Sequence, residues 1–294
     1  MADLLSIRDI LDGKIRKVFR KPFPKPQDGN RPANSEINPE KYPIGFCRQI
    51  RNLVITSIRA NQENRELEGI RELREFCKRG GVFRPVAGIQ HKKYFQNGVQ
   101  AGAYWIDVAN DTVDVNKPKV VYSWMETSGF QDASDPTLCA EVIEDYWGQE
   151  VFPNIYFPNL ATLLPFFHVD SNGEITLAPS PATMIGRTIL SDLRTTEDFL
   201  FSSRFAEKRL PREYVDLIGE HFPFTEEKPH RSFHRTGVSK EELVQVFAQH
   251  RAAIEDGSFK DMIPLTYEPV NTFNKLKLKP REKIVRKLQR ATSF

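Results

Sequence analysis

The sequence predicts an α+β fold that is predominantly helical, in which helical N- and C-terminal parts surround a small antiparallel sheet and extended arms form the two ends. Three observations predict it. Apolar residues recur at helical spacing towards both ends of the chain, short β-favouring runs lie between residues 82 and 126, and six prolines fall between Pro22 and Pro43. Of the 294 residues, 39% are hydrophobic and 28% are charged, so the chain can bury a substantial core.

The first helix is predicted over residues 3–20, where Leu4, Ile7 and Leu11 begin an apolar stripe at helical spacing. The prolines that follow remove backbone donors and favour extended structure. We therefore expect residues 1–43 to form an N-terminal amphipathic helix and a proline-rich arm.

Residues 44–263 are expected to form the globular core. Two helices are predicted between residues 44 and 79, followed by strands at 103–108, 112–115 and 119–124, where β-branched and aromatic residues alternate with turn residues. Next come a helix over 137–147, a strand over 175–178 and two or three helices within 181–221. Ser239 and Glu242 have the spacing of a capping box, and Gly257 is expected to end the helix that they begin.

The last part of the chain, residues 264–294, is expected to form a basic C-terminal arm. Residues 264–279 are predicted to be extended, and Pro280 is predicted to open a short helix. In this segment Leu276 and Leu278 alternate with lysines, which is typical of an added strand.

The sequence predicts a cytoplasmic protein without a transmembrane segment. Charges recur every three or four residues at the start of the chain, and no window approaches the roughly 18 uninterrupted apolar residues needed to cross a bilayer. The three cysteines are widely spaced, which favours reduced thiols over a disulfide framework or a zinc site.

The net charge of +3 conceals a segregation of charge along the chain. Residues 14–25 carry six cations and no acid, and residues 275–290 carry eight cations and one acid. Residues 106–150 carry ten acids and two lysines. Basic ends of this kind suit a polyanion, because each neutralised phosphate releases condensed counterions. The alternatives are an acidic protein surface as the partner, or ordinary solvated helix faces.

Two further clusters, at residues 90–95 and 228–235, mix cations with aromatic rings, a combination that suits single-stranded nucleic acid. The sequence therefore favours a nucleic-acid-binding, self-associating structural protein, like a coat protein or nucleoprotein, that needs no cofactor. Its expected partner is single-stranded nucleic acid, RNA rather than DNA. The candidate phosphate contacts are Lys14, Arg16, Lys17, Arg20, Lys92, Lys93, Arg231, Arg235, Lys275, Lys277, Lys279 and Arg286.

Catalytic motifs are weak. No glycine-rich phosphate loop, HExxH, GxSxG or CxxC occurs. His168, Asp170 and His221 could form the facial triad of an Fe(II)/2-oxoglutarate-dependent oxygenase, which is the alternative enzymatic hypothesis. However, roughly a third of a His-x-Asp match is expected by chance in such a chain, and residues 170–173 are more simply a turn. A scaffold or effector that binds acidic protein or lipid surfaces is a third hypothesis.

Self-association is expected to use the terminal arms. A lone helix of the length of residues 1–20 is marginal in water unless its apolar stripe is buried. The proline-rich connector is long enough for that stripe to reach a neighbouring protomer. The alternative is that both ends fold back on their own chain.

Overall fold

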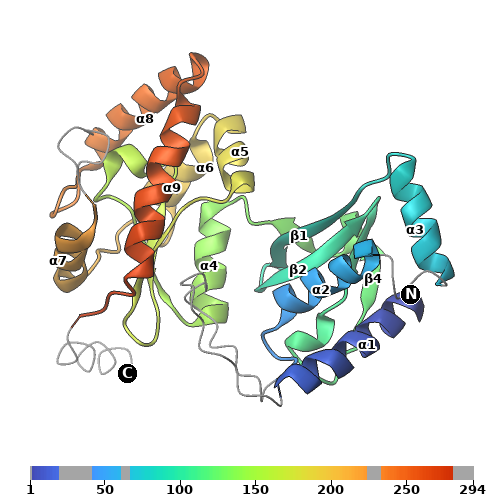
Figure 1. The fold of residues 1–294 in the computed structure, drawn as a ribbon. Coiled ribbons are helices and arrows are strands. Elements are labelled where there is room, and N and C mark those ends of the chain that lie inside the picture. The colour runs from blue at the N-terminus through green and yellow to red at the C-terminus, as the bar shows by residue number, and fades with distance from the viewer. Residues whose placement is uncertain (1, 20–41, 61–66, 224–232, 281–294) are drawn as a thin grey trace. The chain divides into compact units, whose positions relative to one another are not determined.

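The computed structural model describes residues 2–19, 42–60, 67–223 and 233–280. The chain divides into two compact units, Met1–Asp132 and Ala133–Phe294, which are described separately below (Figure 1). The boundaries expected from the sequence lie near residues 43 and 263, whereas this division falls between Asp132 and Ala133.

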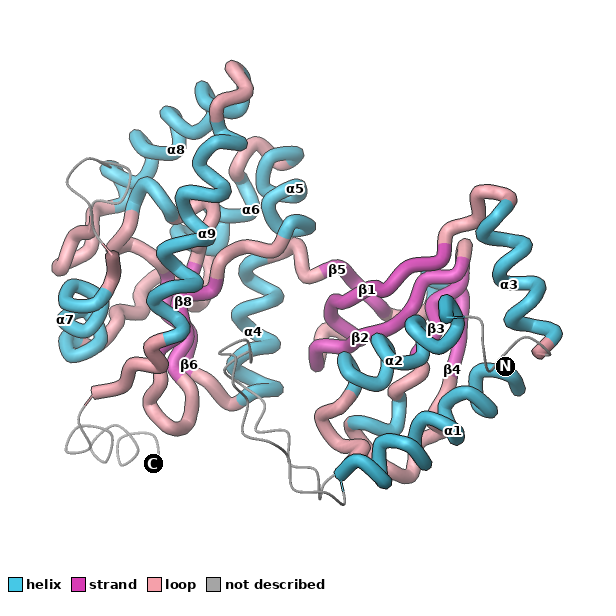
Figure 2. Tube along the Cα trace, viewed as in Figure 1, coloured by secondary structure: helices cyan, strands magenta, loops and turns pink. Residues whose placement is uncertain are grey.

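In the described residues of the first unit, three α-helices pack with a five-stranded antiparallel sheet whose strand order is β4-β3-β2-β1-β5 (Figure 2). The helices are α1 (Ala2–Phe19), α2 (Cys47–Ala60) and α3 (Glu68–Lys78). The strands are β1 (Phe83–Gln90), β2 (Tyr94–Ala101), β3 (Tyr104–Asp107), β4 (Val121–Trp124) and β5 (Phe130–Asp132). The prediction of a small antiparallel sheet is confirmed, but residues 112–115 lie outside the strands, and Asn110–Thr112 form a 3₁₀ turn.

Helix α1 packs within its own unit. Ile7 is 1% exposed and joins a core with Ile50 and Val54 of α2 and Val108 after β3. In the structure the amphipathic face of α1 packs against its own chain, which is the alternative to burial on a neighbouring protomer. The proline-rich arm, residues 20–41, lies outside the described residues.

The second unit has a three-stranded antiparallel sheet with the order β6-β7-β8, packed with six helices of the described chain (Figure 1). The strands are β6 (Glu150–Pro153), β7 (Phe166–Val169) and β8 (Ile175–Ala178). The helices are α4 (Pro136–Trp147), α5 (Ala182–Leu190), α6 (Arg194–Ser202), α7 (Arg212–His221), α8 (Lys240–Glu255) and α9 (Phe259–Lys275).

The helix ends of this unit follow the local signals in the sequence. Asp135 caps α4 by accepting hydrogen bonds from Thr137 N and Leu138 N, and Gly148 ends the helix in the left-handed region. Ser239 and Glu242 form the predicted capping box at the start of α8.

The expectation of an extended segment over residues 264–279 is wrong for most of its length. Helix α9 runs to Lys275 with Pro264 and Pro269 inside it. Each proline costs a backbone hydrogen bond, but the helix buries Phe259, Val270 and Phe273 in the core of the unit. The stabilisation gained by burying these apolar side chains outweighs the helix-breaking effect of the two prolines. Beyond α9 the chain folds back on its own unit, where Leu278 O accepts a hydrogen bond from Ile175 N of β8.

Candidate nucleic-acid interface

The predicted phosphate contacts do not converge on one described surface. Lys14 lies exposed on α1. The side chains of five other candidates lie outside the described residues; they are Arg16, Lys17, Arg20, Arg231 and Arg286.

Lys92 and Lys93 lie exposed in the tight turn between β1 and β2. His91 and Lys92 have φ angles of 52° and 58°, and Lys93 N closes the turn by donating to Gln90 O at 2.9 Å. The two ammonium groups therefore lie at the end of the sheet that the hairpin forms.

The remaining candidates belong to the second unit. Lys275, Lys277 and Lys279 are exposed at and beyond the end of α9. Burial raises the pKa of Glu174, while the nearby Lys277 and Lys279 act to lower it, so a carboxylate already lies beside this cluster. Arg235 Nη1 is 2.8 Å from Asp216 Oδ1. Arg235 therefore has a carboxylate partner within its own unit, in an ion pair whose side chains both remain exposed to solvent.

A group of three exposed rings, none of them among the predicted phosphate contacts, lies on the edge of the first sheet. Tyr104 on β3 is 38% exposed, and Tyr122 and Trp124 on β4 are 57% and 55% exposed. The ring centroids of Tyr104 and Trp124 are 4.4 Å apart with an interplanar angle of 24°, and those of Tyr104 and Tyr122 are 6.2 Å apart. We call these three residues the aromatic edge.

Strand register explains why the rings gather. Met125 N donates to Ala103 O at 2.7 Å, which makes Ala103 and Met125 a hydrogen-bonded pair. Because such pairs alternate along an antiparallel ladder, the next pair, Tyr104 and Trp124, is a non-hydrogen-bonded one. Side chains of such pairs lie closer together, and Tyr122 follows two residues away on the same face.

The same face of the sheet carries the core further along the strands. Ile106, two residues after Tyr104 and opposite Tyr122, lines the apolar interior under α2 and α3. The aromatic edge is thus the corner of a helix-covered face that the helices leave exposed.

Cations lie at the same end of the sheet as the Tyr104–Trp124 pair. Helix α3 ends there, since Phe76 lies against Gly102 in the turn between β2 and β3. Lys78 and Arg79, at the end of α3, are exposed, and Lys78 Nζ is 2.6 Å from Glu75 Oε1 in an exposed ion pair. By contrast, Lys92 follows the other end of β1. Phe83 and Gln90, the first and last residues of this strand, are about 23 Å apart, because each of the seven steps between them rises about 3.3 Å.

Stacked and exposed rings, with cations at the same end of the sheet, can bind the flat faces of unpaired bases and the phosphates that join those bases. The residue types were visible in two predicted strands of the sequence. Their exposure was not, because it depends on which face each residue occupies and on where α3 ends.

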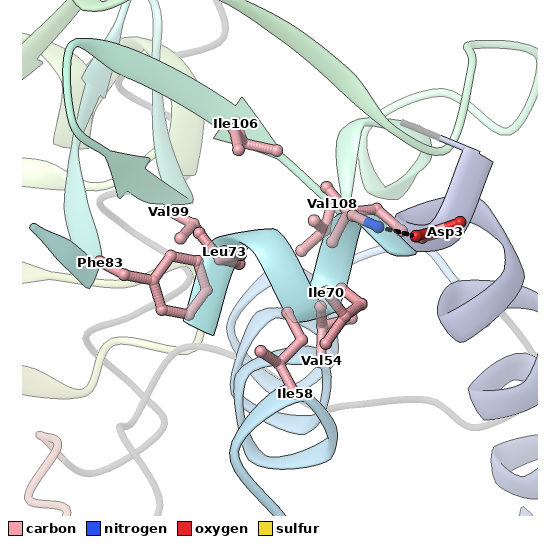
Figure 3. Close-up of a pocket in the computed structure, with 11 residues that line it drawn as sticks. Asp3, Val54, Ile58, Ile70, Leu73, Phe83, Val99, Ile106 and Val108 are labelled. Carbon is pink, nitrogen blue, oxygen red and sulfur yellow. Dashed lines mark hydrogen bonds between the residues drawn. The ribbon is translucent and has the colours of Figure 1, made fainter. Parts of the chain in front are cut away.

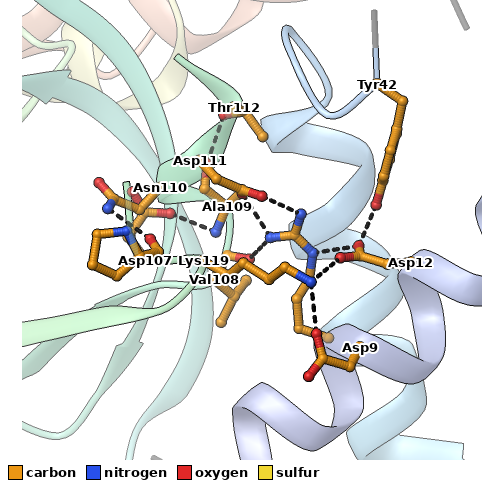
Figure 4. Close-up of polar contacts among 12 residues, drawn as sticks. Asp9, Asp12, Tyr42, Asp107, Val108, Ala109, Asn110, Asp111, Thr112 and Lys119 are labelled. Atoms are coloured by element: carbon orange, nitrogen blue, oxygen red, sulfur yellow. Dashed lines mark hydrogen bonds and ion pairs between the residues drawn. The ribbon is translucent and has the colours of Figure 1, made fainter. Parts of the chain in front are cut away.

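A second feature of this unit is a buried polar network around Arg8 (Figure 4). Arg8 is 0% exposed and donates to both carboxylate oxygens of Asp111, at 2.8 and 2.9 Å, and to Asp12 at 2.7 Å. Lys119 bonds Asp9 and Asp12, and Tyr42 donates to Asp12. The carboxylates around Arg8 are paired within the fold, so the network joins α1 to the segment after β3.

An apolar cavity of about 170 Å³ lies between α2, α3 and the sheet (Figure 3). Its wall includes Val54, Leu73 and Phe83, and its polar rim is Asp3, whose Oδ2 accepts a hydrogen bond from Gly69 N. Such a lining does not suit a charged polymer.

The facial-triad hypothesis is not supported by the arrangement of the side chains. His168 is buried on β7, Asp170 accepts backbone hydrogen bonds from Asn172 and Glu174 in the predicted turn, and His221 is exposed at the end of α7. No three His, Cys, Asp or Glu side chains of the described residues form a group that could hold a metal ion. Such triads usually lie on an eight-stranded barrel, whereas the described residues of this unit form a three-stranded sheet.

Across the described residues, no helix has both the length and the apolarity needed to cross a membrane. No family model, curated protein or solved structure matches the chain.

Proposed function

We propose that this chain binds single-stranded nucleic acid, RNA in particular, and that the aromatic edge of the first unit is a base-stacking surface. The observation that carries the proposal is the stacked, exposed pair of Tyr104 and Trp124, with Tyr122 beside it. Large exposed rings grouped together are unusual on a surface that has no partner.

The nature of the surface favours a single strand over a duplex. Bases inside a duplex are stacked on one another, whereas unpaired bases expose their faces to protein rings. Lys78 and Arg79 at the same end of the sheet supply charge for the backbone. The basic residues of the two chain ends would add sequence-independent affinity.

The proposal includes a structural role, like that of a coat protein or nucleoprotein, and a cytoplasmic location. The described cysteines Cys47, Cys77 and Cys139 are free thiols, which is in keeping with a reducing compartment.

The test is the affinity of a fluorescent oligouridylate for the full chain and for Trp124→Ala. Stacking on one base contributes about 1–3 kcal/mol, so the loss of this ring should weaken binding about five- to 150-fold. Tyr146→Ala, which removes an exposed ring of the second unit, is the matched control and should leave the affinity unchanged. Equal affinities of Trp124→Ala and the parent chain would contradict the proposal.

The contribution of charge is tested by the salt dependence of the same binding. For a single strand the log–log slope falls by about 0.7 for each phosphate contact removed. With an oligonucleotide of a few bases, the double change Lys78→Gln and Arg79→Gln should flatten the slope, whereas Lys92→Gln with Lys93→Gln should do so only for a longer strand. Tighter binding of an acidic peptide than of the oligonucleotide would favour the scaffold hypothesis instead.

A further inference from the structure

The outer edge of β4 is an open strand edge with its own pattern of donors and acceptors. In the described part of the chain β4 is the last strand of its sheet and pairs with β3 alone. Because Ala103 and Met125 form a hydrogen-bonded pair, the bonds between β3 and β4 also join Trp105 to Ser123 and Asp107 to Val121.

The same alternation turns the other backbone groups of β4 outwards. Tyr122 and Trp124 lie in non-hydrogen-bonded pairs with β3, so their N–H and C=O groups point away from it. The only described side chain outside β3 that reaches these groups is that of Thr127, whose Oγ1 lies 3.4 Å from Trp124 O. This contact is long, and a carbonyl oxygen can accept a second hydrogen bond.

The edge also lacks the devices that usually protect such strands from pairing. Proteins guard open edges with lysine, proline, inward-pointing charges or a bulge. Residues 121–124 read Val-Tyr-Ser-Trp and carry no charge and no proline. Two of the four side chains are rings that remain more than half exposed.

We propose that β4 pairs with β4 of a second copy of this chain, antiparallel and about a two-fold axis at Ser123. In this register Tyr122 of one copy lies opposite Trp124 of the other. The two-fold axis generates a second, equivalent pair, in which Trp124 of the first copy lies opposite Tyr122 of the second. Both are hydrogen-bonded pairs that use the outward groups of β4, so every outward donor meets an acceptor. A foreign peptide could also pair with the edge, but the strand is complementary to itself without any further requirement.

The inference rests on the proposed function and deepens it, because the dimer extends the nucleic-acid surface. Residues paired across antiparallel strands have their side chains on the same face of the sheet. The aromatic edges of the two copies therefore form one row of six rings, along which a single strand could stack. Self-association would then occur through the edge of a sheet and not through the terminal arms.

Cross-linking tests the register directly. Ser123 and its symmetry mate form a non-hydrogen-bonded pair with Cα atoms about 4.5 Å apart, a distance that a disulfide can bridge. Full-length Ser123→Cys should therefore form a covalent dimer with oxidised glutathione, and reducing agent should reverse it. Val115→Cys, at an exposed position outside the strands, should cross-link no more than the parent chain, whose three cysteines set the background. Equal cross-linking of the two variants would overturn the proposal.

A second pair of variants separates pairing from stacking. Tyr122→Ala removes the ring and keeps the outward N–H group, whereas Tyr122→Pro removes both without costing a bond to β3. By light scattering, the parent chain and Tyr122→Ala should be dimers and Tyr122→Pro a monomer with unchanged circular dichroism. A monomeric parent chain, or a dimeric Tyr122→Pro, would refute the edge pairing. A dimer that binds no oligonucleotide would refute the proposed function alone.

Discussion

Arg8 lies fully buried between the carboxylates of Asp12 and Asp111, and the fold satisfies its guanidinium group on every side. Burial lowers the pKa of Arg8, but the hydrogen bonds to the two carboxylates outweigh this effect and raise the pKa above its ordinary value. Burial also acts to raise the pKa of Asp12, yet the bonds from Lys119, Tyr42 and Arg8 hold it below its usual value. The ion-paired side chains around Arg8 therefore stabilise one another in their charged forms.

Replacement of Arg8 by leucine should destabilise the first unit by about 3–5 kcal/mol, because two buried carboxylates would lose their common partner. The free energy of unfolding in urea would measure this loss. Arg71→Ala is the control, since Arg71 is 61% exposed and its ion pairs with Glu68 and Glu72 are longer than 3.5 Å, so its removal should cost less than about 0.5 kcal/mol. A loss below 1 kcal/mol for Arg8→Leu would show that the network is not a source of stability.

At the candidate site, the sequence shows which residue types are present but does not show which of them are exposed. Tyr104, Tyr122 and Trp124 were within predicted strands, but alternation alone does not say which face of a strand is covered. That depends on the hydrogen-bond register between β3 and β4 and on the end of α3, and both are tertiary properties. Lys92 and Lys93 were noticed because they are close together in the sequence, yet they lie at the opposite end of the sheet from Trp124.

At the level of elements, the helices with strong end signals were predictable. The capping box of α8 and the glycine after α4 specify helix ends through local bonds that need no tertiary partner. Helix α9 was not predictable in this way, because two prolines contradict its helical period and only packing against the core resolves the conflict. The prediction of a strand at residues 112–115 is wrong. Asp111 is buried in its ion pair with Arg8, and the residues around it form the 3₁₀ turn Asn110–Thr112.

The capping box leads to a prediction about α8. Ser239→Ala removes the oxygen that accepts from Glu242 N and should destabilise the second unit by about 1 kcal/mol. Ser258→Ala is the matched control, because Ser258 occupies the N-cap of α9 without a side-chain cap bond. Thermal unfolding of both variants would show whether the difference exists, and equal melting temperatures would argue against a stabilising role of the capping box.

For the whole molecule, the two units should respond in opposite directions to mild acid. In the first unit, burial raises the pKa of Asp107 to about 6, although bonds from Ala109 N and Gln96 oppose the shift. In the second unit, burial lowers the pKa of His168 and of His250 to about 4. The raised pKa of the Asp107 carboxyl stabilises the first unit at low pH, and this stability is lost as the pH rises through 6. The lowered pKa values of the two histidines stabilise the second unit above pH 6.5, and this stability is lost as the pH falls towards 4.

Between pH 6.5 and 4, hydrogen exchange of amides in the second unit should therefore accelerate, relative to its intrinsic rate, and that of the first unit should slow. Each buried histidine should contribute on the order of 2 kcal/mol to this loss, since one unit of pKa is about 1.4 kcal/mol. The lowered pKa of Asp12 affects stability only below its ordinary value of 3.8, outside this window. Asp107→Asn should remove the slowing of hydrogen exchange in the first unit. His250→Gln should halve the acceleration in the second unit, because the glutamine amide can still bond the Thr162 hydroxyl that lies near His250 Nδ1. Parallel trends in the two units would mean that these buried groups do not control the pH dependence of the fold.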